Sequence, residues 1–263
     1  MRNVGLALGA TLTEVQVAEV VRKSLRNFFR DFVEIVIALT LPSAQLRVEI
    51  PIEGRENLDA ALAKGSGVIA LGAHLGNFFL VGTRLAIENY PSWVLINQPR
   101  NHQFAKFMDD YRLKVQQRTI HARPRREALR KLYEILRGNE LAVVIADEYR
   151  RNNGIHLPFF GHTVIARRGP ATLALRTGAA VVPVYLIHDK SQCLKMIVEA
   201  ELDLIRNDRD KAAIKENTLR MTQWLEKTVR IYPEQWNWMN IHWRDDLDKA
   251  PVAKEQRIQG LTS

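Results

Sequence analysis

The sequence predicts an α/β protein, a single domain in which a mostly parallel, mixed central sheet is covered by helices on both faces. The first observation is that short apolar runs alternate along the chain with segments of helical periodicity. Strands of a parallel sheet are buried on both faces and therefore give such runs. The second observation is that the 263 residues contain no repeat and no low-complexity linker. This length suffices for one domain with a large core.

Four apolar runs predict buried strands of this sheet. They are "GVIALGA" (67–73), "WVLIN" (93–97), "LAVVIA" (141–146) and "AVVPVYLI" (180–187). The amphipathic stretches between them predict helices at 78–89, 101–116, 124–137 and 169–177. A more alternating run, "KMIVEAELDL" (195–204), predicts an edge strand. We expect a long final helix over 208–233, which Pro233 ends.

An amphipathic helix is expected near the N-terminus, over residues 11–41, and Thr11 and Glu14 have the spacing of a capping box at its start. Apolar residues at helical spacing and a group of basic residues share this segment. They are Val21, Leu25, Phe28 and Phe32, with Arg22, Lys23, Arg26 and Arg30. Such a helix either packs against the domain or lies partly immersed in an anionic interface. We place the domain at 1–245 and a polar tail at 246–263.

Composition narrows the partners and the class of protein. The net charge of +9 and the pI near 9.8 favour an anionic partner, either nucleic acid, anionic lipid or an acidic carrier protein, although a solvated basic face would look the same. The single cysteine excludes an intramolecular disulfide and favours a reducing compartment. No apolar run reaches the roughly 18 to 20 residues of a membrane-spanning helix. Patterns typical of serine hydrolases, P-loop proteins, dinucleotide enzymes and zinc proteases are absent.

Ligands of parallel sheets bind beyond the carboxyl ends of the strands, which directs attention to the residues after Ala73, Asn97 and Ala146. His74 follows the first strand, where it is either a general base or a buried structural histidine. If it is a base, the Asn77 amide and the backbone N–H groups after His74 are candidate donors to an oxyanion. Asp147 and Glu148 follow the third strand, as functional carboxylates or as a salt-bridged loop.

Other residues are candidates for substrate binding. After the second strand, these are Arg100, Asn101 and Arg112. Arg167 and Arg168 precede Gly169 and Pro170 at a predicted helix start, where arginines suit a phosphate or a carboxylate but also occur as solvated side chains. Phe159 and Phe160, in "PFFG", are candidates for lining an apolar groove.

Several of these segments, in this order, resemble the bacterial lipid A biosynthesis (lauroyl/myristoyl) acyltransferase family, within the lysophospholipid acyltransferase superfamily. The segments are "GAHLGNFFLVG", "NQPRNHQFAKFMDDYR", "LRGNELAVVIADEYRRNNGIHLPFFGHTVIARRGPATLALRTGAAVVPVY" and "YPEQWNWMNIHWR". The resemblance implies a glycerolipid-acyltransferase-like fold. It also implies transfer of a fatty acyl group from an acyl thioester to a hydroxyl of a lipid or glycolipid, with His74 as the base.

The chain departs from the family pattern near the C-terminus, where the family's usual histidine and arginine after "QWxW" are Asn240 and His242, and at the position of the catalytic acid. In that family the catalytic histidine is followed five positions later by an acidic residue, and here that position is Phe79. Asp147 or Glu148 could orient His74 instead, a backbone carbonyl could hold its ring, or the chain could be an inactive relative that binds lipid or serves as a scaffold.

The resemblance also sets the expected surroundings of the protein. We expect a peripheral protein on the cytoplasmic face of the bacterial inner membrane, since family members usually carry an N-terminal membrane helix and this chain begins after that point. The expected partners are an anionic membrane surface, a lipid or glycolipid acceptor and an acyl carrier protein, and not nucleic acid. Acyl carrier protein or coenzyme A would deliver the acyl group as a co-substrate, with no metal and no tightly bound cofactor.

Overall fold

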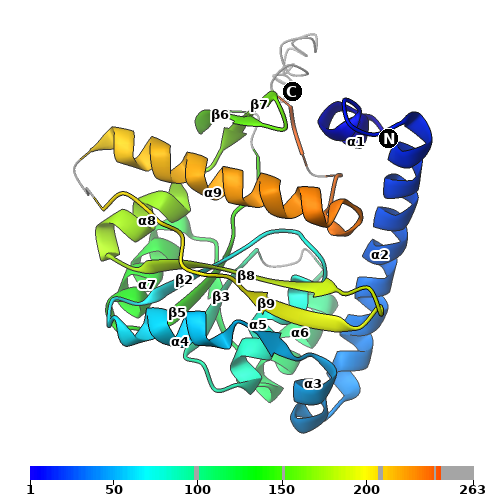
Figure 1. Ribbon diagram of the computed structural model, residues 1–263. Coiled ribbons are helices and arrows are strands. Elements are labelled where there is room, and N and C mark those ends of the chain that lie inside the picture. Colours follow the sequence, from blue (N-terminus) through cyan, green and yellow to red (C-terminus); the bar gives the residue numbers. More distant parts are fainter. Residues whose placement is uncertain (98–100, 150–151, 207–209, 240, 244–263) are drawn as a thin grey trace, which may run out of the picture.

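The structure, a computed structural model, describes residues 1–97, 101–149, 152–206, 210–239 and 241–243. A central sheet lies between two layers of helices, as Figure 1 shows. The predicted α/β class and the mostly parallel, mixed sheet are therefore confirmed.

Seven strands form the central sheet within the described residues, in the order β1-β9-β8-β2-β5-β3-β4. Their bounds are Ile52–Glu53 (β1), Val68–Gly72 (β2), Ser92–Ile96 (β3), Arg118–His121 (β4), Leu141–Ile145 (β5), Ala180–His188 (β8) and Leu194–Val198 (β9). Neighbouring strands are parallel except β8 and β9, which pair antiparallel. A separate antiparallel hairpin consists of β6 (Ile155–Phe159) and β7 (His162–Ala166).

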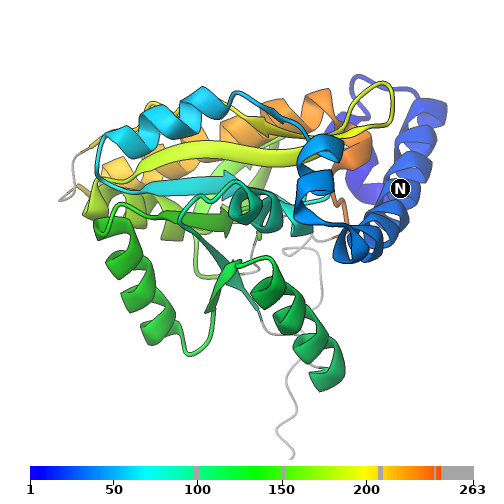
Figure 2. The same ribbon diagram turned by 90° about the horizontal axis from the view of Figure 1, so that it is seen from below.

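Helices cover both faces of the sheet. They are α1 (Arg2–Leu8), α2 (Glu14–Thr40), α3 (Ser43–Glu49), α4 (Arg55–Ala63), α5 (Phe79–Ile87), α6 (His102–Lys114), α7 (Arg125–Arg137), α8 (Gly169–Thr177), α9 (Lys211–Ile231) and the short 3₁₀ helix η1 (Pro233–Gln235). One hydrophobic cluster joins α7, α8 and α9 to the sheet, and the other joins α3, α4 and α5 to its opposite face. Figure 2 shows the two layers from a second side.

The strands supply both clusters because successive side chains of a strand point to opposite faces. On β2, Ile69 and Leu71 belong to the cluster with α9, whereas Val68 and Ala70 belong to the cluster with α4. All four side chains are completely buried. The continuous apolar run that predicted this strand thus has its physical cause in a sheet covered on both sides.

Some predicted elements need correction. β9 was expected at the edge, but β1 pairs with its outer side, and β1 was too short to give a sequence signal. The capping box lies two residues later than predicted, with Thr13 at the N-cap and Gln16 as its partner. Thr11 instead donates a hydrogen bond to the Leu8 carbonyl at the end of α1. The polar tail at 246–263 lies outside the described residues.

Helix α2 turns much of its apolar side away from the domain. It runs along one side of the molecule in Figure 1, and the exposed large apolar side chains on it are Val15, Leu25, Phe29, Phe32, Val33, Val36 and Ile37. Phe29 is 67% exposed and Val36 is 60% exposed. Polar residues of the same helix face inward, since Ser24 and Asn27 donate hydrogen bonds to the carbonyls of Trp236 and Glu234. The predicted helix is confirmed, and its apolar residues divide between the core, which Val17, Ile35 and Ala38 join, and the exposed side.

Within the described residues, no helix combines the length and the apolarity needed to cross a bilayer.

Candidate active site

Two chain segments far apart in sequence meet at the carboxyl ends of β2 and β5. The two strands are parallel neighbours, and Gly72 is in register with Ile145. His74 and Asp147 each follow their strand by two residues, so the pairing places them side by side. The His74 Nδ1 lies 2.7 Å from the Asp147 Oδ1.

Asp147 is held by three N–H groups. Its Oδ2 accepts from the His74 backbone N–H at 2.8 Å and from the Trp236 indole at 2.8 Å, and its Oδ1 faces the imidazole. The residue is only 5% exposed. A buried carboxylate costs several kcal/mol unless it is well hydrogen-bonded, and these donors supply that compensation.

The hydrogen bonds fix the tautomer of His74. A carboxylate only accepts, so the Nδ1 carries the proton and the Nε2 presents a lone pair. The His74 side chain remains 20% exposed, and Nε2 is the ring nitrogen left for a substrate. Burial acts to lower the pKa of His74, but the hydrogen bond and charge of Asp147, with the charge of Glu148, raise that pKa above its ordinary value. The imidazolium that forms when His74 takes a proton is therefore stabilised.

The chain after His74 passes through a narrow space. The His74 carbonyl accepts from the Asn237 N–H at 2.9 Å, and Gly76 lies against the Leu186 carbonyl of β8. Gly76 has a φ of 53°, and a Cβ there would lie 1.8 Å from that carbonyl oxygen. Only glycine fits this position, which fixes the approach of the His74 loop to the sheet.

Aromatic residues border the imidazole. The Phe78 ring packs edge-on against His74, with ring centroids 4.6 Å apart. The ring centroids of Phe78 and Phe79 are 4.1 Å apart. Phe79 is 42% exposed and lies 6.1 Å from Phe32 of α2. The position of the missing acid is thus an outward apolar one, and of the three alternatives left open by the sequence, the structure favours a carboxylate from the neighbouring strand end.

Glu148 has a different partner. Its carboxylate forms an ion pair with Arg167, which directly follows β7, and both side chains are more than one-third exposed. Glu148 therefore acts on His74 through its charge and not through a hydrogen bond. Arg168, which is exposed, occupies the N-cap position of α8, and Gly169 begins that helix.

Asn77 does not lie where the sequence-based prediction needs it. Its side chain is completely buried, and the amide donates to the Asp31 carbonyl at 3.2 Å and to Glu34 at 3.1 Å, both on α2. The backbone N–H groups of His74, Gly76, Asn77 and Phe78 also have partners within the protein. In this arrangement, the donors just named already hold the loop in place and do not face an oxyanion.

Phe159 and Phe160 line no groove. They are 0% and 5% exposed, and both pack among tryptophans near the C-terminus. These residues are apolar because the turn of the β6–β7 hairpin packs into the core. In this turn Phe160 adopts a φ of 52° before Gly161.

The other predicted binding residues are placed as follows. Arg100 lies outside the described residues. Asn101 is exposed, and its carbonyl accepts the Ala105 N–H at the start of α6. Arg112, in the last turn of α6, forms an ion pair with Asp109 at 2.8 Å. The ion pair of Arg112 is formed within α6 and does not involve His74.

Trp236 is the site residue that sequence reasoning missed. Its side chain is 2% exposed, and the indole N–H donates to the carboxylate that orients His74. A buried tryptophan must find an acceptor for its N–H, so the tryptophan-rich segment "QWNWMNIHW" carried a signal of a polar partner. The sequence alone gave no indication that this partner was Asp147.

Comparisons with known proteins agree with the resemblance. A model of the family described as bacterial lipid A biosynthesis acyltransferase matches residues 1–245. The chain is 25% identical over 258 residues to the phosphatidylinositol mannoside acyltransferase of Mycolicibacterium smegmatis, covering 96% of this chain and 81% of that protein. It is 26% identical over 237 residues to the phosphatidylinositol mannoside acyltransferase of Mycobacterium tuberculosis, covering 88% of this chain and 72% of that protein. Because the family match extends from the first residue past Trp236, the chain belongs to the bacterial lipid A biosynthesis acyltransferase family.

Proposed function

We propose that this protein transfers a fatty acyl group from an acyl thioester to a sugar hydroxyl of an anionic glycolipid, with His74 as the general base. The observation that carries the proposal is the hydrogen-bonded set of His74, Asp147 and Trp236 at the carboxyl ends of β2 and β5. It supplies an oriented imidazole with a free Nε2 at the edge of the sheet where ligands bind.

The chemistry follows from that geometry. The Nε2 of His74 takes the proton of the acceptor hydroxyl while the hydroxyl oxygen attacks the thioester carbonyl. The carbon–sulfur bond then breaks, and the imidazolium returns the proton to the departing thiolate. Asp147 holds the ring and stabilises its charge between these two steps.

The acceptor class rests on the relatives. The family name refers to lipid A, and the similar mycobacterial proteins are named for phosphatidylinositol mannosides. Both are sugar-bearing lipids that carry phosphate. A net charge of +9 suits such acceptors, and we assign contacts with their phosphate to Arg167 and Arg168 beside Glu148.

We further propose that the outward side of α2 lies on the cytoplasmic face of the bacterial inner membrane. Large apolar side chains exposed to water favour an interface, and Arg22 and Arg26 extend the same side with positive charge. Phe32 on this side packs against Phe79, Phe79 packs against Phe78, and Phe78 packs against His74. A lipid entering from the membrane would therefore meet the imidazole directly beyond these rings.

Replacing Phe29 and Val33 together by serine should weaken binding to vesicles of anionic phospholipid at least about tenfold, because two side chains of this size lose their apolar burial. Sedimentation with vesicles measures this. Leu129→Ser is the matched control, since Leu129 is exposed on α7 at the side of the molecule opposite α2 (Figure 1). Equal binding by the double variant and the control would contradict this orientation.

The enzymatic proposal is tested with the purified protein, a phosphatidylinositol mannoside or a lipid A precursor, and a radiolabelled acyl thioester. Acyl carrier protein and coenzyme A thioesters form separate arms, which identify the donor. A labelled product that carries one new ester is expected. If neither thioester gives an acylated glycolipid although the thioester and the glycolipid each bind to the protein, the inactive, lipid-binding alternative is correct.

A further inference from the structure

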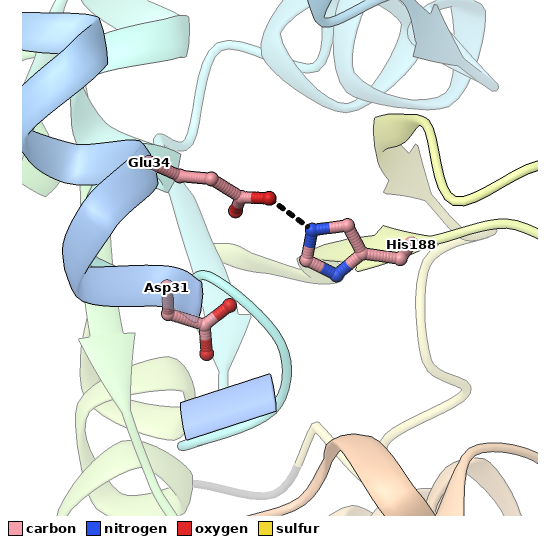
Figure 3. Close-up of side chains that lie close together, drawn as sticks. All are labelled: Asp31, Glu34 and His188. Atoms are coloured by element: carbon pink, nitrogen blue, oxygen red, sulfur yellow. Dashed lines mark hydrogen bonds and ion pairs between the residues drawn. The ribbon is translucent and has the colours of Figure 1, made fainter. Parts of the chain in front are cut away.

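A second group of polar side chains lies beneath α2, apart from the His74–Asp147 pair. Asp31 and Glu34 reach inward from α2, and His188 is the last residue of β8. Figure 3 shows both carboxylates reaching toward the His188 ring, with Glu34 joined to its Nε2. That hydrogen bond measures 2.6 Å, and one ligand atom from each of the three residues lies within 4.8 Å of the others.

Four buried atoms in this place have no hydrogen-bond partner among the described residues. One is a donor, Arg30 Nε, and three are acceptors, namely Asp31 Oδ1, Asn77 Oδ1 and His188 Nδ1. Asn77 is completely buried and His188 is 4% exposed. The Asn77 amide nitrogen donates to Glu34 Oε2, which places the Asn77 side chain beside this cluster.

The three acceptor atoms can present lone pairs. The His188 Nε2 donates its proton to Glu34, and neutral imidazole then leaves Nδ1 as an acceptor. Buried acceptors without donors are rare in proteins and point to an additional group at the site. Three of the four unpartnered atoms are acceptors, and the fourth, Arg30 Nε, lies 3.7 Å from Glu34 Oε1, so an electron-poor group suits the three acceptors.

The charges agree with this conclusion. Arg30 is the nearby cation: its Nε lies 3.7 Å from Glu34 Oε1, and its guanidinium also donates to Gln192. One guanidinium thus faces two carboxylates, which leaves an excess of negative charge around the unpartnered oxygens.

We propose that Asp31, Glu34 and His188 bind a divalent transition-metal ion of the Zn²⁺ type, with the Asn77 carbonyl as a further oxygen ligand. A mixed set of carboxylate, imidazole and amide donors suits Zn²⁺ better than Mg²⁺ or Ca²⁺, which prefer oxygen alone. The ion binds the His188 Nδ1, leaves the hydrogen bond between the His188 Nε2 and Glu34 in place, and joins α2 to β8. It thereby fixes α2, the helix that turns apolar side chains outward. Binding of the ion can be measured without an assay of acyl transfer.

Titration calorimetry of the whole protein with ZnCl₂ tests this directly. We expect one saturable ion per chain and a higher Tm with Zn²⁺ present. Asp31→Asn is the principal variant, because it keeps the shape of the side chain and removes no described hydrogen bond of the Asp31 side chain. It should bind Zn²⁺ more than about tenfold more weakly while keeping the Tm of the metal-free protein.

His156→Gln is the matched control, since His156 is exposed on β6 and should leave Zn²⁺ binding unchanged. Glu34→Gln and His188→Gln should weaken binding like Asp31→Asn, and circular dichroism shows whether these two variants remain folded. If wild-type protein shows no saturable binding, water satisfies these acceptors and the proposal is wrong. If Asp31→Asn binds as the wild type does, or if His156→Gln abolishes binding, the ion is held elsewhere and the proposal is equally wrong.

Discussion

His74→Ala should lower kcat for acyl transfer by about 10²- to 10⁴-fold, the usual contribution of a positioned general base. The acceptor hydroxyl would then have to lose its proton to water, because no imidazole remains beside Asp147 to accept it. KM for the glycolipid should change little, because Nε2 is assigned to the proton and not to binding of the lipid. A steady-state assay with radiolabelled acyl thioester measures both constants.

Control measurements separate this loss from misfolding. His74 is 20% exposed in its side chain, and its removal leaves Asp147 with the Trp236 indole and the backbone N–H of residue 74. The circular dichroism spectrum and the binding to vesicles should therefore match those of the wild type. Full activity in the variant would remove His74 from the mechanism.

Asp147→Asn should be nearly as damaging, with a loss in kcat of about 10²- to 10⁴-fold. The Oδ2 position receives two N–H donors, from the His74 backbone and from Trp236, so the amide oxygen of asparagine stays there. The amide nitrogen then faces the His74 Nδ1 and donates to it. This forces the ring proton onto Nε2, which can no longer accept a proton from the acceptor hydroxyl.

The same substitution changes the dependence on pH. The pKa of His74 is raised in the wild type, so the imidazole is protonated and inactive as a base below that pKa, and kcat/KM should rise as the pH increases through it. In Asp147→Asn the imidazolium loses its carboxylate, the pKa falls, and the rise in the residual activity should move to lower pH. Glu148→Gln is the comparison, with a loss below about tenfold, since Glu148 pairs with Arg167 and acts on His74 only through its charge. Equal losses in the two variants would contradict the assignment of Asp147.

The sequence predicted the parts of the site that depend on local pattern. His74 and Asp147 each follow a continuous apolar run, and such runs identify the ends of buried parallel strands. Their pairing, however, requires β2 to lie beside β5, although His74 and Asp147 are 73 positions apart in the sequence. Periodicity reports which face of a strand is buried but not which strand lies next to it.

The incorrect predictions have a different cause. Asn77 was assigned to catalysis because an amide after His74 could face a substrate, but α2 returns to this loop and uses the amide itself. Phe159 and Phe160 were predicted to line an apolar groove but are core residues. Apolar side chains occur in both places, so composition does not distinguish them. For α2 the periodic pattern correctly predicted a helix, but it could not say that polar Ser24 and Asn27 face the domain.

The central claim is that Asp147 acts through His74 in place of the acid that is missing at Phe79. A double-mutant cycle tests it most directly, with kcat measured for His74→Ala, Asp147→Asn and the two combined. If the carboxylate serves only to orient and stabilise the imidazole, the combined variant should be no slower than His74→Ala alone. Losses that multiply in the combined variant would contradict the account, because Asp147 would then contribute to acyl transfer independently of His74.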